Sequence, residues 1–169
     1  MLDRPTLQSM YDAGIRTILT GVETADPECM VSIGQNIKVN SIIQEKLKWC
    51  EEIGIKAYTF FLIGSPEESW SSIKRTVASA KELGTESTLT VMTPFPDTPL
   101  YWRAIKEDLL PKEMAYEQWN SYTATVRTYH LTLRELTRAR LWACLETIIP
   151  YRLSQARRQG RRALLQTYW

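Results

Sequence analysis

Hydrophobic positions in the first two thirds of the chain alternate between a helical period and short apolar runs. Two kinds of element are therefore expected in alternation: helices over 7–13, 41–53 and 69–83, and strands over 17–22, 57–63 and 87–92. Strands and helices that alternate at this spacing are joined by right-handed crossovers. The chain is expected to form a parallel α/β sheet, either open or part of a barrel.

Residues that start and stop helices mark the ends of these elements. Ser69 is a good N-cap for the third helix, and Gly14, Gly54 and Gly84 stand where each helix would end. The run from 57 to 63 is apolar almost throughout, which is typical of a parallel strand covered on both faces.

The pattern changes beyond Pro94. A short helix is expected over 100–106, whereas residues 114–129 are polar and aromatic without a clear period. A capping box at 132–135 predicts a longer helix, which should end at Ile149 because the next residue is proline. An Arg-rich helix from Tyr151 to about Gln166 is expected to close the chain.

The composition is typical of a globular protein with a hydrophobic core. Of its 169 residues, 44% are hydrophobic and 24% are charged, a balance that argues against disorder. No apolar run approaches the roughly 20 residues of a membrane-spanning helix, and the first residues lack the pattern of a signal peptide. A cytoplasmic protein without a transmembrane segment is expected.

The charge is unevenly distributed. Between Arg134 and Arg162 the sequence holds eight Arg against two Glu, so the tail is basic. Such a tail could meet phosphate or a membrane surface, although a solvated charged helix face is the commoner cause of the pattern. No aromatic residues are interleaved with the last five of these arginines, Arg152, Arg157, Arg158, Arg161 and Arg162, so no nucleic-acid partner is expected.

Polar and proline-rich segments follow each predicted strand. Ligands in parallel α/β folds bind beyond the carboxyl ends of the strands, so these segments are the first candidates for function. They read Gly-Val-Glu-Thr at 21–24, Leu-Ile-Gly-Ser-Pro-Glu-Glu at 62–68 and Met-Thr-Pro-Phe-Pro-Asp-Thr-Pro-Leu-Tyr at 92–101. All three are expected to line one rim.

In order and spacing, these segments resemble the last three strand ends of radical S-adenosylmethionine (radical SAM) enzymes. The subfamily they resemble most often carries an N-terminal cobalamin (B12)-binding domain. The resemblance covers roughly residues 7–101 and implies the C-terminal half of a partial (β/α)6 TIM-like barrel, with three parallel strands and their helices, over residues 1–108. A helical C-terminal extension would follow over 109–169.

The resemblance implies contacts to S-adenosylmethionine at each strand end. Glu23 matches an acid near the ribose and amino-acid portion, where a carboxylate accepts hydrogen bonds from hydroxyls and pairs with an ammonium group. Thr24 follows it, where the family often has Ser. Leu62 and Gly64 match an apolar-x-Gly motif that abuts adenine. Glu68 matches the acid that closes this motif, although the adjacent helix N-terminus also favours a carboxylate without any function.

The third strand end completes the implied site. Met92 and the turn at Pro94 match residues that contact adenine and form a wall of the substrate cavity. Glu67 and Asp97 stand where the family usually has glycine. Asp tolerates a left-handed backbone better than Glu does, so the turn at Glu67 is expected to differ from the family pattern.

The cysteines depart most from the resemblance. Radical SAM chemistry needs a [4Fe-4S] cluster held by a Cys-x-x-x-Cys-x-x-Cys loop. The three cysteines, Cys29, Cys50 and Cys144, are too far apart in sequence to form that loop or a CxxC zinc site, and their odd number and wide spacing do not suggest a disulfide framework. The chain is therefore expected to be a fragment whose missing N-terminal half, or another subunit, supplies the cluster.

The functional expectation follows from the resemblance. A complete enzyme would reductively cleave S-adenosylmethionine to a 5′-deoxyadenosyl radical and act on an unknown small-molecule or lipid-like substrate, with cobalamin-dependent methyl transfer as one version. This chain alone is expected to be inactive. The alternative is a non-catalytic remnant or partner-binding module. In either case, half a barrel is expected to expose two strand edges and its apolar inner face.

Overall fold

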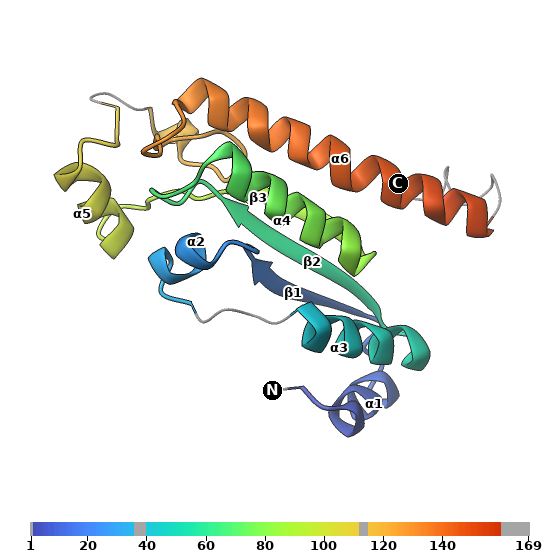
Figure 1. The fold of residues 1–169 in the computed structure, drawn as a ribbon. Helices are drawn as coiled ribbons and strands as arrows, with labels where there is room; N and C mark the ends of the chain where they lie inside the picture. The colour runs from blue at the N-terminus through green and yellow to red at the C-terminus, as the bar shows by residue number, and fades with distance from the viewer. Residues whose placement is uncertain (1, 36–39, 112–114, 160–169) are drawn as a thin grey trace.

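The computed structural model describes residues 2–35, 40–111 and 115–159 (Figure 1). In chain order its elements are α1 (Arg4–Asp12), β1 (Thr17–Glu23), α2 (Pro27–Ser32), α3 (Asn40–Ile53), β2 (Lys56–Ile63), α4 (Trp70–Leu83), β3 (Glu86–Val91), α5 (Pro99–Lys106), the 3-10 turn η1 (Tyr116–Gln118) and α6 (Leu133–Gln159). The predicted alternation of helices and strands is confirmed, as is the short helix near 100–106.

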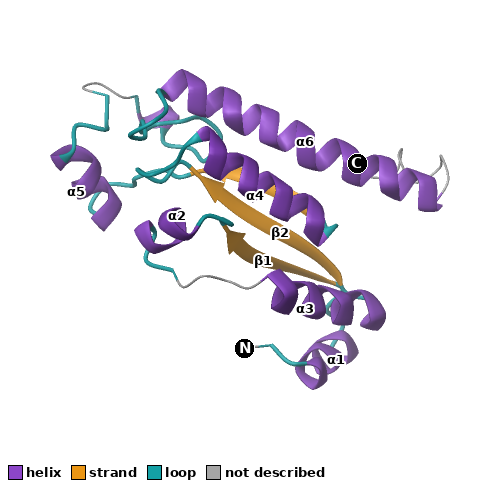
Figure 2. Ribbon diagram, viewed as in Figure 1, coloured by secondary structure: helices purple, strands orange, loops and turns teal. Residues whose placement is uncertain are grey.

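The strands form one parallel sheet in the order β1-β2-β3 (Figure 2). In its middle, Gly21 pairs with Phe60 and Phe60 pairs with Thr88. The expected parallel sheet is therefore confirmed. Because all three strands point the same way, their carboxyl ends meet at one rim.

The two faces of the sheet have different surroundings. On the covered face, strand side chains pack against α4 and α6 in a core that includes Val22, Phe61, Ile63, Ile73, Val77, Leu89, Val91, Leu136, Ala139 and Ala143. Successive strand residues point to opposite faces. On the other side, which we call the open face, Leu19 is 66% exposed, while Phe60 and Leu62 are only partly buried.

One of the two strand edges expected to be exposed is covered. The Arg140 Nε of α6 donates a hydrogen bond to the Leu89 carbonyl of β3 (3.2 Å), and the Cys144 thiol lies 3.7 Å from the same oxygen. The Val91 N–H donates to the Ser121 carbonyl (2.8 Å). The expectation is therefore wrong for β3, because α6 and the segment before it cover this edge and bond to the Leu89 carbonyl and the Val91 N–H.

The chain between α5 and α6 folds back onto the rest of the molecule. Leu109 and Val126 are buried against Ala104 of α5. Leu131 belongs to the core that the sheet shares with α4 and α6. The hydrophobic core thus continues across the boundary proposed between residues 108 and 109.

The predicted helix break at Pro150 is wrong, because α6 runs through it. A proline inside a helix removes a backbone hydrogen bond and costs about 3 kcal/mol. The helix continues because both sides of the proline contact other elements: Ala143 and Thr147 are buried before it, and Arg152 pairs with Glu86 after it (3.3 Å). The predicted end near Gln166 lies outside the described residues.

Helix α2 was not predicted, although its start carries a local signal. The Asp26 carboxylate accepts hydrogen bonds from the N–H groups of Glu28 and Cys29 (both 3.1 Å), and Pro27 occupies the first turn. An N-cap Asp followed by Pro is a common helix start. The Asp-Pro pair was therefore sufficient to indicate this short helix.

Gly14 and Gly64 share a φ of +97° but differ in their surroundings. A Cβ at Gly64 would lie 3.0 Å from Leu136 Cδ2 and 3.2 Å from Val91 Cγ1, whereas one at Gly14 would meet nothing within 4 Å. We expect Gly14→Ala to lower the free energy of unfolding by about 1 kcal/mol, the cost of the left-handed backbone. Gly64→Ala should cost about 2 to 4 kcal/mol, because overpacking adds to that strain. Urea denaturation measures both, and equal losses would contradict the close approach at Gly64.

Candidate functional site

The rim at the carboxyl ends of β1, β2 and β3 brings together segments that are far apart in sequence. In Figure 1, α2 and the loop before α4 lie just beyond the tips of β1 and β2. The residues implied as a cofactor site all belong to these strand ends or follow them directly: Glu23, Thr24, Leu62, Gly64, Glu68, Met92 and Pro94.

Glu23 ends β1 in a strained conformation. Its φ is +74°, a left-handed value that costs a non-glycine residue roughly 1–2 kcal/mol. The register of β1 against β2 shifts between Gly21 and Glu23, which marks a β-bulge. The side chain turns back over Gly21, where an added Cβ would lie 2.1 Å from Glu23 Oε1. Because Val22 points into the covered face, Gly21 makes room for this carboxylate on the open face.

Thr24 points away from Glu23 and into the protein. Its side chain is buried, its hydroxyl lies 3.0 Å from the Thr76 hydroxyl of α4, and it accepts a hydrogen bond from the Asp26 N–H (3.1 Å). These bonds fasten the loop after β1 to α4. The spacing of residues in the sequence does not predict a hydrogen-bond partner that lies 52 positions away.

Asp26 reinforces this attachment. Its carboxylate pairs with Arg75 of α4 and caps α2. Burial raises the pKa of Asp26, but the hydrogen bonds from Arg75 and Cys29 outweigh burial, so the pKa lies below its usual value.

Glu68 is fully enclosed. Its side chain accepts hydrogen bonds from the Gly64 N–H (3.1 Å) and the Ser72 hydroxyl, and its backbone carbonyl accepts one from the Thr128 hydroxyl (2.7 Å). Burial raises the pKa of Glu68, and the bonds from Ser72 and Gly64 oppose that rise. The carboxylate thus holds the turn after β2 against the first turn of α4.

The remaining implied residues line the open face and the rim. Leu62 lies on the open face in register with Thr90. The Met92 N–H donates to the Ile63 carbonyl (2.7 Å), which extends the sheet beyond β3, and Pro94 is buried directly after it. Glu23, Leu62 and Met92 therefore come from three neighbouring strand ends.

At the two positions where the family usually has glycine, the backbone follows the expectation for each residue type. Asp97 is left-handed, with a φ of +67°. Glu67 is not among the described residues that have a positive φ, and in that loop the left-handed position is Gly64. The backbone conformation at Glu67 therefore does not require glycine.

A pocket of about 490 Å³ lies at the rim beside Met92. Its walls come from the end of α2, the residues after β3 and the start of α5: Ser32, Ile33, Gly34, Met92, Thr93, Thr98, Pro99, Leu100 and Arg103. Met92 is the one implied site residue in this lining. The pocket is mostly apolar, and among the described residues that line it Arg103 carries the charge.

Arg103 is a charged rim residue that sequence reasoning missed. Its guanidinium donates hydrogen bonds to Ser32 (2.9 Å), Glu67 (2.5 Å), Glu107 (3.1 Å) and the Tyr129 hydroxyl (2.8 Å). The hydrogen bond to Glu67 is the main reason that the pKa of Arg103 lies above its usual range. The spacing of Arg103 and Glu107, four apart on one helix, was the available signal. Arg103 ties together α2, α5 and the loops after β2 and before α6.

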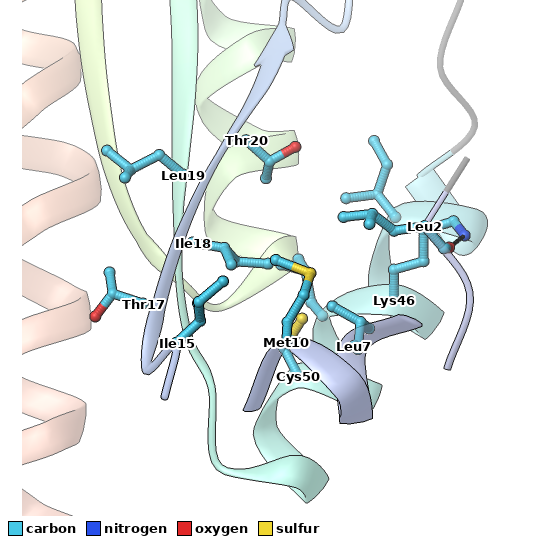
Figure 3. A pocket seen from close by; sticks show the side chains of 12 residues that line it. Leu2, Leu7, Met10, Ile15, Thr17, Ile18, Leu19, Thr20, Lys46 and Cys50 are labelled. Atoms are coloured by element: carbon cyan, nitrogen blue, oxygen red, sulfur yellow. Dashed lines mark hydrogen bonds between the residues drawn. The ribbon is translucent and has the colours of Figure 1, made fainter. Parts of the chain in front are cut away.

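A second pocket, of about 510 Å³, lies at the opposite end of β1 (Figure 3). Side chains of α1, β1 and α3 line it, including Leu7, Met10, Ile18, Leu47 and Cys50. Figure 3 shows Ile18 pointing toward Met10, whereas Leu19 points to the other side of the strand. The pocket opens beside β1, the edge strand of the sheet. Its apolar lining suits packing against another apolar element more than binding of a charged cofactor.

The cysteines do not form a cluster site. Cys29 and Cys50 are buried, and within residues 2–35, 40–111 and 115–159 no three His, Cys, Asp or Glu side chains come together as metal ligands. Burial, followed by the nearby Glu68 carboxylate, raises the pKa of the Cys29 thiol to about 12. A thiol that resists ionisation is a poor metal ligand. The residues present therefore do not fit a [4Fe-4S] cluster, whereas the carboxylate on the open face fits a hydroxyl- or ammonium-bearing ligand.

Replacing Glu68 with Gln tests the effect of its buried charge. A raised pKa in the folded state means that Glu68 contributes most stability below its unfolded pKa of about 4.3, and that this contribution falls as pH rises through the folded pKa. Gln accepts from the Gly64 N–H and donates to the Ser72 hydroxyl without a charge. As pH rises above about 4, Glu68→Gln should gain stability relative to the wild type in urea denaturation, until Glu68 is ionised in the folded wild-type protein as well. The exposed Glu51→Gln is the control, and parallel pH curves for wild type and Glu68→Gln would refute this account of the buried acid.

Comparisons with known proteins agree with the resemblance found in the sequence. No protein-family model matches the chain. A curated protein described as an uncharacterized methyltransferase, from Pyrococcus horikoshii, is 27% identical over 132 residues, which are 78% of this chain and 28% of that protein. The chain thus spans less than a third of that relative's length.

Two solved structures share the fold. One is TsrM, a radical S-adenosylmethionine methyltransferase from Kitasatospora setae with cobalamin and a [4Fe-4S] cluster bound; the TM-score is 0.56 at 19% identity, over 63% of this chain and 21% of that one. The other is the radical SAM enzyme coproporphyrinogen III oxidase (HemN) from Escherichia coli, with a TM-score of 0.59 at 14% identity, over 89% of this chain and 30% of that one. The predicted resemblance is confirmed: the chain has the fold of part of a radical SAM enzyme, with three parallel strands, their helices and a C-terminal helix.

Proposed function

We propose that this chain is the part of a radical SAM enzyme that holds the adenosine and amino-acid portions of S-adenosylmethionine and lines one side of the substrate cavity. The proposal rests on the fold shared with two radical SAM enzymes and on the chemistry of the strand ends. When bound beside a [4Fe-4S] cluster, S-adenosylmethionine supplies a 5′-deoxyadenosyl radical for hydrogen abstraction. The thiolates for that cluster come from outside these 169 residues, whose three cysteines lack the required spacing.

The observation that carries the proposal is the geometry of Glu23. A strained backbone persists where the surrounding structure holds it, and such positions are frequent in ligand-binding sites. Here the β-bulge and the missing side chain of Gly21 together keep a carboxylate on the open face at a strand end. That carboxylate is suited to accept hydrogen bonds from ribose hydroxyls or to pair with the methionine ammonium group.

We assign different roles to the other implied residues. Leu62 and Met92 would contact the adenine ring from neighbouring strand ends, and Gly64 would allow the backbone to approach it. Thr24 and Glu68 have hydroxyl and carboxylate groups that already bond within the chain. They would act as positioning residues that hold the loops beneath the cofactor.

Methyl transfer is the reaction that the comparisons favour. The curated relative is described as a methyltransferase, and TsrM is a radical SAM methyltransferase whose structure holds cobalamin. We therefore propose a methyltransferase activity for the complete enzyme, with cobalamin as its second cofactor. The pocket beside Met92 and Arg103 would form part of its substrate cavity.

Calorimetric titration of the full chain with S-adenosylmethionine tests the proposal. Glu23→Gln should weaken binding about tenfold, because it removes the charge of the hydrogen-bond acceptor. Gly21→Ala should weaken binding similarly, because the new Cβ displaces the Glu23 carboxylate. The matched control is Glu28→Gln, an exposed acid on α2.

Two outcomes would contradict the proposal. If Glu23→Gln and Glu28→Gln change the affinity for S-adenosylmethionine by the same amount, Glu23 is not part of the binding site. The absence of binding by the folded wild-type chain would favour a non-catalytic module that retains the fold.

A further inference from the structure

Helix α6 carries a row of exposed aliphatic side chains on the side away from the sheet. Leu141, Leu145, Ile149 and Leu153 are 59%, 51%, 48% and 53% exposed. They recur every four residues and therefore lie along one side of the helix. We call these four residues the aliphatic stripe.

The stripe is not part of the core. The opposite side of α6 is buried against the sheet and α4 through Leu136, Ala139, Ala143 and Thr147. Figure 1 shows α6 running along the outside of the molecule, so its other long side faces solvent. A helix that is apolar on both sides normally has a second partner.

Two tryptophans lie near the stripe, and one of them, Trp142, is partly buried against the core. Trp142 follows Leu141 in sequence and packs edge-to-face on Trp70 of α4, with ring centroids 5.7 Å apart. Trp70 is 38% exposed at the start of α4, whose inner side is buried. Tryptophan has an apolar body and a polar N–H, which suits it to the boundary between water and an apolar phase.

The charges around the stripe are basic. Arg134 and Arg138 precede it and Arg157 follows it, and all three are exposed. The two acids of α6 are engaged within the chain: Glu135 accepts hydrogen bonds from Thr132 at the helix start, and Glu146 pairs with Lys81. This surface is therefore complementary to a partner that is apolar and anionic.

A second copy of the chain meets that requirement poorly. An antiparallel pair of α6 helices centred on the stripe would bring Arg138 of one copy near Arg157 of the other. A parallel pair would place Arg138 beside its own equivalent. Both arrangements oppose like charges at the ends of the contact, which disfavours association.

We infer that the aliphatic stripe of α6, with its flanking arginines, docks on the surface of an anionic phospholipid bilayer. The stripe and the tryptophans would enter the boundary between headgroups and acyl chains, while Arg134, Arg138 and Arg157 would meet lipid phosphates. Insertion would be lateral, since no helix in the described part of the chain is long and apolar enough to cross a membrane. This inference is independent of the proposed cofactor site.

Vesicle flotation of the full chain tests the inference. Binding is expected to vesicles made from an equal mixture of phosphatidylglycerol and phosphatidylcholine, to weaken with added salt, and to be largely absent from pure phosphatidylcholine. Leu145→Ser combined with Ile149→Ser should weaken binding about tenfold or more, because it removes the apolar contact. Arg134→Gln combined with Arg138→Gln should also weaken binding and reduce its salt dependence.

Matched controls separate the stripe from general surface effects. Val31→Ser removes an aliphatic side chain that is 69% exposed on α2, and Lys48→Gln removes an exposed cation on α3. Both should bind vesicles like the wild type, and all variants should keep the wild-type circular dichroism. Equal binding to neutral vesicles, or stripe variants that bind normally, would overturn the inference. A concentration-dependent dimer in ultracentrifugation that the stripe variants abolish would assign the surface to a second copy instead.

Discussion

The close packing around Gly64 is the constraint on which the rim depends. Without a side chain there, the backbone leaving β2 approaches Leu136 of α6 and Val91 of β3. The same residue donates its N–H to the buried Glu68, which also accepts from Ser72 at the start of α4. One left-handed residue thus joins the sheet, α4 and α6, and the position of each strand end follows from that junction.

The two sides of the sheet have separate roles in this arrangement. On the covered face, α4 and α6 bury a continuous core, and Arg140 of α6 bonds to the outer edge of β3. On the open face, Glu23 is held in a strained conformation above Gly21, with its carboxylate beside the end of β1. Stability is therefore concentrated behind the sheet, which allows the strain of the candidate site to persist in front of it.

Elements with strong local signals were predictable, and those that depend on distant contacts were not. Helix α4 carries its own N-cap at Ser69 and a left-handed Gly84 at its end, so the sequence alone indicates its bounds. The break predicted at Pro150 failed because contacts with other elements hold the helix on both sides.

At the site, the strand-end motifs located the rim, since parallel strands must end together. The pairing of Thr24 with Thr76 and the bond from Arg103 to Glu67 depend on tertiary packing, which spacing does not reveal.

Mapping the S-adenosylmethionine contact by two-dimensional NMR of the 15N-labelled chain tests the central claim most directly. The rim hypothesis predicts that amide shifts change at 21–24, at 62–65 and at 92–93, the three strand ends that meet in the structure. It predicts no change around the apolar pocket of Figure 3, at Leu7, Met10 and Leu47. Shifts confined to that pocket, or spread evenly over the chain, would contradict the assignment of the rim as the cofactor site.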